Sequence, residues 1–131
     1  MIYQKKQEIL EAVYKDSQGV SAAFNLNMLA HLNWRFDGNF DLNLFQHQAI
    51  YNNYKNQIES YLYCEQNCKV RLEKLDLTVE LKAGESILTL ISRKFNVEQM
   101  QEYLPAYGLN LINTWTDMKQ WFALLLCQLQ S

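Results

Sequence analysis

The stretch QIESYLYCE, residues 57–65, carries the pattern that decides the fold of this chain. Its alternate residues from Ile58 to Cys64 are small or apolar, whereas the residues between them are acidic or tyrosine. Successive side chains of a strand point to opposite faces of a sheet. The alternation therefore predicts a strand with one face turned toward a core.

Three neighbouring stretches are also rich in residues typical of strands. Turn signals at Asn52-Asn53 and Ala83-Gly84 separate them, so together with residues 57–65 they predict three to four strands. Strands that follow one another so closely favour antiparallel pairing. The three stretches are HQAIYN (residues 47–52), KVRLEKLDLTVELK (69–82) and SILTLISRKF (86–95).

Apolar residues at helical spacing precede these strands. They predict a short amphipathic helix over residues 4–15 and a helix of about four turns that opens with Ser21 as its N-cap. The second helix should end at the Asp37-Gly38 turn. A further short helix, Leu42–Gln46, is expected after Asp41, which would cap it.

The C-terminal part returns to helical spacing and then closes with two strands. Residues 97–107 predict a helix that Asn96 caps and that Pro105 ends or kinks. The stretches 109–116 and 120–129 predict a hairpin around the turn Thr116–Lys119. The sequence therefore predicts an α+β fold with N-terminal helices, a mostly antiparallel sheet of about five strands or more, and a closing helix and β-hairpin.

Composition places the chain among folded, soluble, single-domain proteins. Of its 131 residues, 49% are apolar and 20% are charged, and the formal net charge is −2. Because the charges are mixed and form no basic stripe, nucleic acid is not an expected partner. No apolar run approaches the roughly 20 residues of a membrane span. The N-terminus also lacks the apolar core of a secretory signal, so we expect a cytoplasmic protein without membrane contact.

The cysteines and histidines predict neither a metal site nor a nucleophilic catalyst. Cys64, Cys68 and Cys127 lack a second Cys/His pair at metal spacing. Free thiols are therefore expected, with a Cys64–Cys68 disulfide as the alternative. His31 and His47 have no third ligand nearby and are typical of surface or core histidines. No Ser-His-Asp or Cys-His set is apparent, so hydrolysis is not favoured.

The run YKDSQGVSAAFNLNMLAHLN, residues 14–33, resembles the C-terminal part of the histidine-specific, S-adenosylmethionine-dependent methyltransferases of ergothioneine biosynthesis. Three later blocks resemble the same family in the same order, so the resemblance covers nearly the whole chain. These blocks are NFDLNLFQHQAIYN (residues 39–52), AGESILTLISRKF (83–95) and WTDMKQWFALLL (115–126). The residues of the first run that fall on the family pattern are Tyr14, Asp16, Gly19, Val20, Ser21, Phe24 and Asn25.

The resemblance implies roles in substrate binding for several of these residues. Tyr14 matches a tyrosine near the substrate amino group, where a hydroxyl can orient a nitrogen for methyl transfer. Ser21 matches a threonine that contacts the bound amino acid, and Phe24 matches a pocket phenylalanine. Ser92 matches a serine of the family. Simpler alternatives are a packed tyrosine, a capping serine and a core phenylalanine.

Two departures fall on the positions that, in the family, recognise the substrate side chain. Leu90 follows Thr89 where the family has a glutamate that receives the imidazole of histidine. Ser60 replaces a methionine. The part of the pocket that holds the amino-acid backbone is therefore largely retained, and the part that recognises imidazole is altered. Glu85 is an alternative carboxylate, but its turn position favours solvent exposure.

The resemblance implies S-adenosylmethionine as the cofactor of the parent enzyme, yet this chain lacks the features that bind it. A Gly-rich turn after a first strand and an acidic residue after the second are required. The four glycines are scattered instead. We therefore expect a C-terminal portion of a longer enzyme, with residues 1–94 as the substrate-binding lobe and 95–131 as the last helix and hairpin of a missing cofactor-binding domain. No cofactor and no catalytic residue are expected on this chain alone.

The expected partners follow from the missing domain. An amino-acid substrate and a separate cofactor-binding half are the first candidates. An apolar hairpin without its neighbouring strands also favours self-association. The alternative is an orphan, non-catalytic domain that binds a small molecule or serves assembly, and a degenerate fragment that only folds is the third.

Overall fold

The structure is a computed structural model that describes Ala12 and residues 19–131. The helix expected over residues 4–15, and with it Tyr14, lies outside the described residues. None of the helices in the described part is long and apolar enough to cross a membrane. Its main elements are α2 (Val20–Phe36), β1 (Phe45–Asn52), β2 (Gln57–Cys64), β3 (Cys68–Leu72), β4 (Leu77–Leu81), β5 (Ser86–Arg93), α3 (Val97–Tyr103), β6 (Leu109–Thr116) and β7 (Ala123–Leu129).

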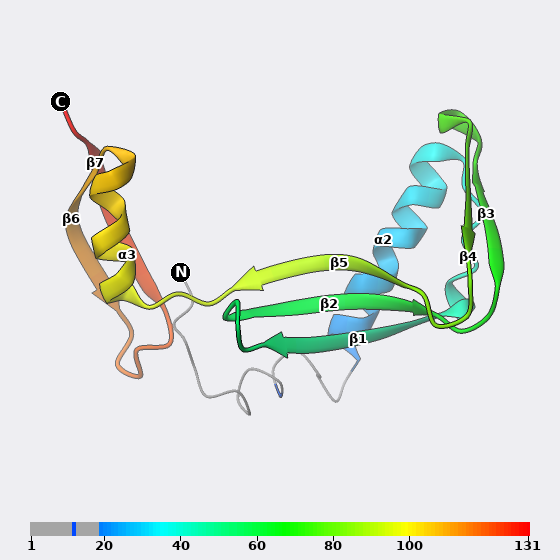
Figure 1. The fold of residues 1–131 in the computed structure, drawn as a ribbon, viewed down its shortest axis with the longest axis horizontal. Helices are drawn as coiled ribbons and strands as arrows, with labels where there is room; N and C mark the ends of the chain where they lie inside the picture. The colour runs from blue at the N-terminus through cyan, green and yellow to red at the C-terminus, as the bar shows by residue number, and fades with distance from the viewer. Residues whose placement is uncertain (1–11, 13–18) are drawn as a thin grey trace.

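The predicted α+β fold with antiparallel strands is confirmed. Strands β1, β2 and β5 form one sheet in the order β1-β2-β5, and β3–β4 and β6–β7 form two separate hairpins. All strand pairs are antiparallel. The strands are thus divided among three sheets, whereas one larger sheet was predicted. Figure 1 shows α2 beside the three-stranded sheet, with the β3–β4 hairpin at one end of it.

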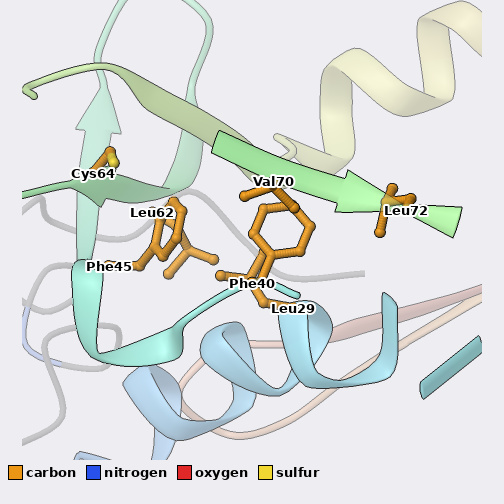
Figure 2. Close-up of a cluster of buried hydrophobic side chains, with 7 residues drawn as sticks. All are labelled: Leu29, Phe40, Phe45, Leu62, Cys64, Val70 and Leu72. Carbon is orange, nitrogen blue, oxygen red and sulfur yellow. The ribbon is translucent and has the colours of Figure 1, made fainter. Parts of the chain in front are cut away.

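The alternation in β2 turns one face of the strand toward the core, as the sequence predicts. Ile58, Ser60, Leu62 and Cys64 are all buried, while Glu59, Tyr61 and Tyr63 are half-buried. Leu62 and Leu29 of α2 are fully buried, and Figure 2 shows them in one cluster with Phe40, Phe45, Cys64, Val70 and Leu72. This cluster joins α2, the three-stranded sheet and the β3–β4 hairpin into one core.

Helix α2 begins earlier than predicted, and Ser21 is not its N-cap. Gly19 occupies the cap position in the left-handed conformation with φ 71°. Glycine adopts that conformation at little cost because it has no Cβ. The Ser21 side chain is therefore not used as a cap and lies on the first turn of α2.

The end of α2 is close to the predicted turn. Asp37, at φ 52°, is the C-cap, and its backbone N–H donates to Asn33 O. Gly38 follows, and a Cβ there would lie 2.5 Å from Leu72 Cδ2, so any larger residue would displace the buried Leu72 side chain. After Asp41, which accepts a hydrogen bond from Asn43 N as expected of a cap, the helix is a single 3₁₀ turn, Leu42–Leu44.

A β-bulge changes the register between β2 and β5. Ser60 pairs with Leu90, but Tyr61 pairs with Leu88, so Thr89 is the extra residue. The Thr89 hydroxyl donates to Ser60 O at 2.9 Å. Because of the bulge, Leu90 lies opposite Ser60 on the face that α2 covers, and Leu88 lies opposite Tyr61 on the other face.

The C-terminal elements form a unit of their own. Asn96 caps α3 by accepting from Gln99 N, as predicted, and Pro105 lies in the 3₁₀ turn Leu104–Tyr107 that follows the helix. The 3₁₀ turn that follows α3 contacts β6, and Figure 1 shows α3 and the β6–β7 hairpin together, apart from the three-stranded sheet. Strand β7 begins at Ala123, later than predicted, because Asp117 accepts hydrogen bonds from Trp121 N and Phe122 N in the connecting loop.

Candidate functional site

A cavity of about 450 Å³ lies between the first half of α2 and the sheet face that α2 covers. Its lining is mostly apolar, with a few hydroxyl and amide groups and one imidazole. Cavities of this size and character are typical binding sites for small molecules. The lining residues are Val20, Ser21, Phe24, Asn25, Asn27, Met28, His47, Ser60, Thr89 and Leu90.

Most of the described residues that the sequence predicts as substrate-binding meet at this cavity. Ser21 and Phe24 reach it from α2, Ser60 from β2 and Leu90 from β5. Phe24 is 75% exposed, so the alternative that it belongs to the core is wrong. Three elements that are distant in sequence therefore bring these side chains to one place.

Two further predicted residues are not placed in the lining. Ser92 lies on the same sheet face as Ser60, since it pairs with Ile58, but its hydroxyl accepts a hydrogen bond from Lys94 Nζ at 2.7 Å. Tyr14 lies outside the described residues. Glu85, the alternative carboxylate, is exposed at the turn before β5 and accepts from Lys82 N at 2.8 Å. It does not line the cavity.

The cavity also contains a histidine whose role the sequence did not predict. The amide of Asn25, which is 6% exposed, donates to His47 Nδ1 at 2.8 Å and to Tyr61 O at 3.2 Å. An amide nitrogen only donates, so His47 Nδ1 accepts and the ring hydrogen lies on Nε2. Nε2 is buried and has no hydrogen-bond partner among the described residues.

A signal for His47 was present in the stretch HQAIYN. His47 is two residues from Phe45 and two from Ala49, and both of these are buried. The period of two therefore places the imidazole on the inner face of β1. A polar side chain on the inner face of a strand is unusual, because a buried polar group needs a partner. Its neighbour Asn25 is 22 residues earlier in the sequence, on a helix whose contacts no local pattern specifies.

No acidic or basic side chain lines the cavity apart from His47. The nearest carboxylate along the strand, Glu59, is on the opposite face of β2 from Ser60. It accepts hydrogen bonds from Tyr61 Oη at 2.7 Å, Gln57 Nε2 at 2.6 Å and Asn52 Nδ2 at 3.1 Å. The Tyr61 hydroxyl is the main cause that lowers the pKa of Glu59. Glu59 therefore does not replace a carboxylate at position 90.

The arrangement is suited to binding rather than to bond cleavage. Within residues 19–131 and Ala12, no group of three or more His, Cys, Asp and Glu side chains could hold a metal ion. The cysteines are free thiols, with Cys64 Sγ and Cys68 Sγ 3.3 Å apart. The cavity offers an apolar surface with hydroxyl, amide and imidazole donors, which can hold and orient a small ligand.

Residues 3–129 match the family described as histidine-specific methyltransferase, SAM-dependent. The chain belongs to this family. Among curated proteins it is similar to the histidine N-alpha-methyltransferase of Mycobacterium tuberculosis, with 42% identity over 108 residues, and to that of Mycolicibacterium smegmatis, with 41% identity over 108 residues. Each alignment covers 82% of this chain and 34% of the relative. The family predicted from the sequence is confirmed, and the chain spans about a third of the length of these relatives.

The family implies S-adenosylmethionine (SAM), but the described residues do not form a site for it. A nucleotide-binding turn places glycines between a strand and the helix that follows. Here Gly38 packs against Leu72 after α2, Gly84 lies between β4 and β5, and Gly108 lies between the last 3₁₀ turn and β6. Gly19 precedes α2 without a described strand before it. None of the four occupies the required position.

Proposed function

We propose that this chain is the substrate-binding C-terminal portion of a SAM-dependent N-methyltransferase that acts on an amino acid. The observation that carries this proposal is the cavity under α2, where Ser21, Phe24, Ser60 and Leu90 meet. These are positions to which the family resemblance assigns substrate contacts. Residues 1–94 would form the substrate lobe, and residues 95–131 would complete a cofactor-binding domain.

The C-terminal unit supports the second part of this proposal. In the described residues β7 pairs only with β6, so its other edge has no strand beside it. Leu124, Leu126 and Leu129 of this hairpin are 66%, 49% and 77% exposed. An apolar hairpin with an open edge is suited to joining a larger sheet. A cofactor-binding half would supply that sheet and the methyl donor.

The cavity wall favours a side chain other than that of histidine. Binding an imidazole N–H without its acceptor costs about 1–3 kcal/mol, or roughly a tenfold to hundredfold loss of affinity. Leu90 offers no acceptor and Ser60 is smaller than methionine. We therefore propose that the amino acid carries an apolar or aromatic side chain, which would pack against Leu90 and Phe24.

His47 would hold the polar end of such a ligand. It lies on β1 opposite Leu62 of β2, whereas Leu90 lies on β5 opposite Ser60 of β2. The two side chains are therefore two strands apart and offset by two residues along the strands, on the same wall of the cavity. The unpartnered Nε2 hydrogen of His47 would donate to the carboxylate of a ligand whose side chain rests on Leu90.

The test is methyl transfer over a panel of amino acids, with this chain joined to a cofactor-binding half. We expect aromatic or aliphatic amino acids to exceed histidine in kcat/KM. Leu90→Glu should raise the activity on histidine by about tenfold, because it restores an acceptor for the imidazole. Leu88→Glu is the matched control, since Leu88 lies on the same strand but on the opposite face.

Two results would contradict the proposal. If no amino acid is methylated or bound, the chain is a non-catalytic binding or assembly domain. If histidine is the best substrate and Leu90→Glu brings no gain, the recognition of the side chain does not involve position 90.

A further inference from the structure

The sulfur atoms of Cys64 and Cys68 are in contact outside the amino-acid cavity. Cys64 Sγ and Cys68 Sγ are 3.3 Å apart, and both residues are free thiols. A disulfide bond is about 2.05 Å long, so the two atoms need to approach by little more than an ångström. The pair connects the end of β2 to the start of β3.

The backbone around both cysteines is fixed by neighbouring strands. Cys64 N donates to Glu85 O at 2.8 Å, and Gly84 N donates to Cys64 O at 2.8 Å. Cys68 pairs with Leu81 in the β3–β4 hairpin. The thiols are therefore held next to each other by the fold and do not meet by chance motion of a loop.

Of the two thiols, only that of Cys68 is accessible from the surface, since the Cys64 side chain is fully buried. Cys68 is half-buried and lines an open hollow of about 400 Å³ with Asn67, Lys69 and Glu80 among its walls. Cys64 is 1% exposed but lines a second open hollow of about 620 Å³ beside Tyr63 and Gly84. A small disulfide reagent thus has access to Cys68 first.

We propose that Cys64 and Cys68 form a redox-active dithiol that closes to a disulfide by exchange with a low-molecular-weight disulfide such as oxidised glutathione. The Cys68 thiolate attacks one glutathione sulfur, and the other glutathione leaves as a thiolate that takes up the proton released by Cys68. Cys64 then loses its proton and attacks Cys68 Sγ, which releases the second glutathione as a thiol. Two protein thiols are oxidised, and one glutathione disulfide is reduced to two thiols.

The closed disulfide would tie the β3–β4 hairpin to the three-stranded sheet. Burial, and then the contact with Cys64, raises the pKa of Cys68 to about 11, so the first attack is slow at neutral pH. The short loop gives a modest gain in stability on closure. We expect Tm to rise by about 3–8 °C after oxidation.

The test is incubation of the full chain with oxidised glutathione, followed by alkylation in denaturant and mass spectrometry. Wild type and Cys127→Ser should each form one internal Cys64–Cys68 bond, and their Tm should rise. Cys68→Ser should form no internal bond and show no rise. Cys127→Ser is the matched control because Cys127 is also a half-buried thiol, without a second cysteine at its side.

The proposal is independent of the amino-acid site, so its outcome does not depend on any methyltransferase activity. It is overturned if Cys68 carries a stable glutathione while Cys64 remains open to alkylation. It is equally overturned if both residues remain open to alkylation after prolonged exposure to the oxidant.

Discussion

The lobe formed by residues 19–94 and the C-terminal unit are both rich in apolar residues, but they differ in how many of these residues they bury. In the lobe, alternate residues of β2 are buried beneath α2, and Leu29 and Leu62 are inaccessible to solvent. In the C-terminal unit, most apolar residues of β6 and β7 are half-buried or exposed, although Ala123 is buried. An apolar strand that remains exposed after folding indicates a missing neighbour. The lobe therefore has its own buried core, whereas the apolar side chains of β6 and β7 remain largely accessible in the described residues.

The largest expected effect is on the free energy of unfolding, which should depend much more on a buried side chain of the lobe than on an exposed one of the C-terminal unit. Leu62→Ala leaves a cavity in the core of the lobe and should lower the free energy of unfolding by about 2–5 kcal/mol. Leu124→Ala removes a side chain that is 66% exposed and should change it by less than about 0.5 kcal/mol. Urea unfolding of the two variants measures both effects. Equal losses would mean that the two regions share one core.

Self-association should depend on the C-terminal unit. We expect dimers or larger assemblies, because the apolar face of β7 and its open edge are available for pairing. Leu126→Glu places a charge on that strand and should weaken association by at least about tenfold. Leu75→Glu is the control, since Leu75 is likewise 49% exposed but lies in the turn between β3 and β4. A monomeric wild type in light scattering would contradict this expectation.

Two substitutions of His47 separate ligand binding from structure in the lobe. His47→Asn can keep an acceptor near the Nδ1 position for Asn25 but loses the Nε2 donor, so amino-acid affinity should fall by about tenfold or more with little change in Tm. His47→Gln keeps a donor near Nε2 and should retain most of the affinity. Calorimetry with an amino acid and its decarboxylated amine measures both. If the two variants bind alike and only the Tm of His47→Gln falls, His47 has a structural role alone.

The smallest expected effect is a loss of stability at acid pH in the loop between β6 and β7. The backbone N–H of Phe122, and then those of Trp121 and Lys119, lower the pKa of Asp117 below its ordinary value. A lowered folded-state pKa gives stability that is present above the ordinary value and is lost as the pH falls through the folded value. Below about pH 4, the protection of the Trp121 and Phe122 amides, measured against their intrinsic exchange rates at each pH, should therefore fall. Asp117→Asn should show no such acid dependence, and an unchanged profile in the variant would be inconsistent with this role.

Local patterns predicted the elements of the fold better than their contacts. The alternation in β2 and the Asn96 cap are set by residues close together in sequence, and both are confirmed. The bulge at Thr89 depends on how β5 meets β2, and its effect on Leu90 has no local signal. Ser21 was mistaken for a cap because Gly19 can adopt the left-handed conformation and begin the helix earlier.

For the candidate site too, local patterns predicted individual residues better than the contacts between them. The residues on the family pattern could be named from the sequence. Of the six residues that were predicted to bind the substrate, four line one cavity. The period of β1 is enough to place His47 on the inner face, but its hydrogen bond from Asn25 could not be predicted, because that bond crosses the interface of helix and sheet. A polar residue on the inner face of a strand indicates a particular role only when its hydrogen-bond partner is known.

The most direct test of the amino-acid site is a titration of the isotopically labelled full chain with phenylalanine, followed by its backbone amide resonances. We expect the largest shifts at residues of the cavity wall, Asn25, Ser60 and Leu90, and no shift at Leu111 of β6. The shifts should be reduced in His47→Asn and retained in His47→Gln. Shifts centred on the hollow between Trp34 and Leu75, with the cavity wall unchanged, would contradict the assignment of the site.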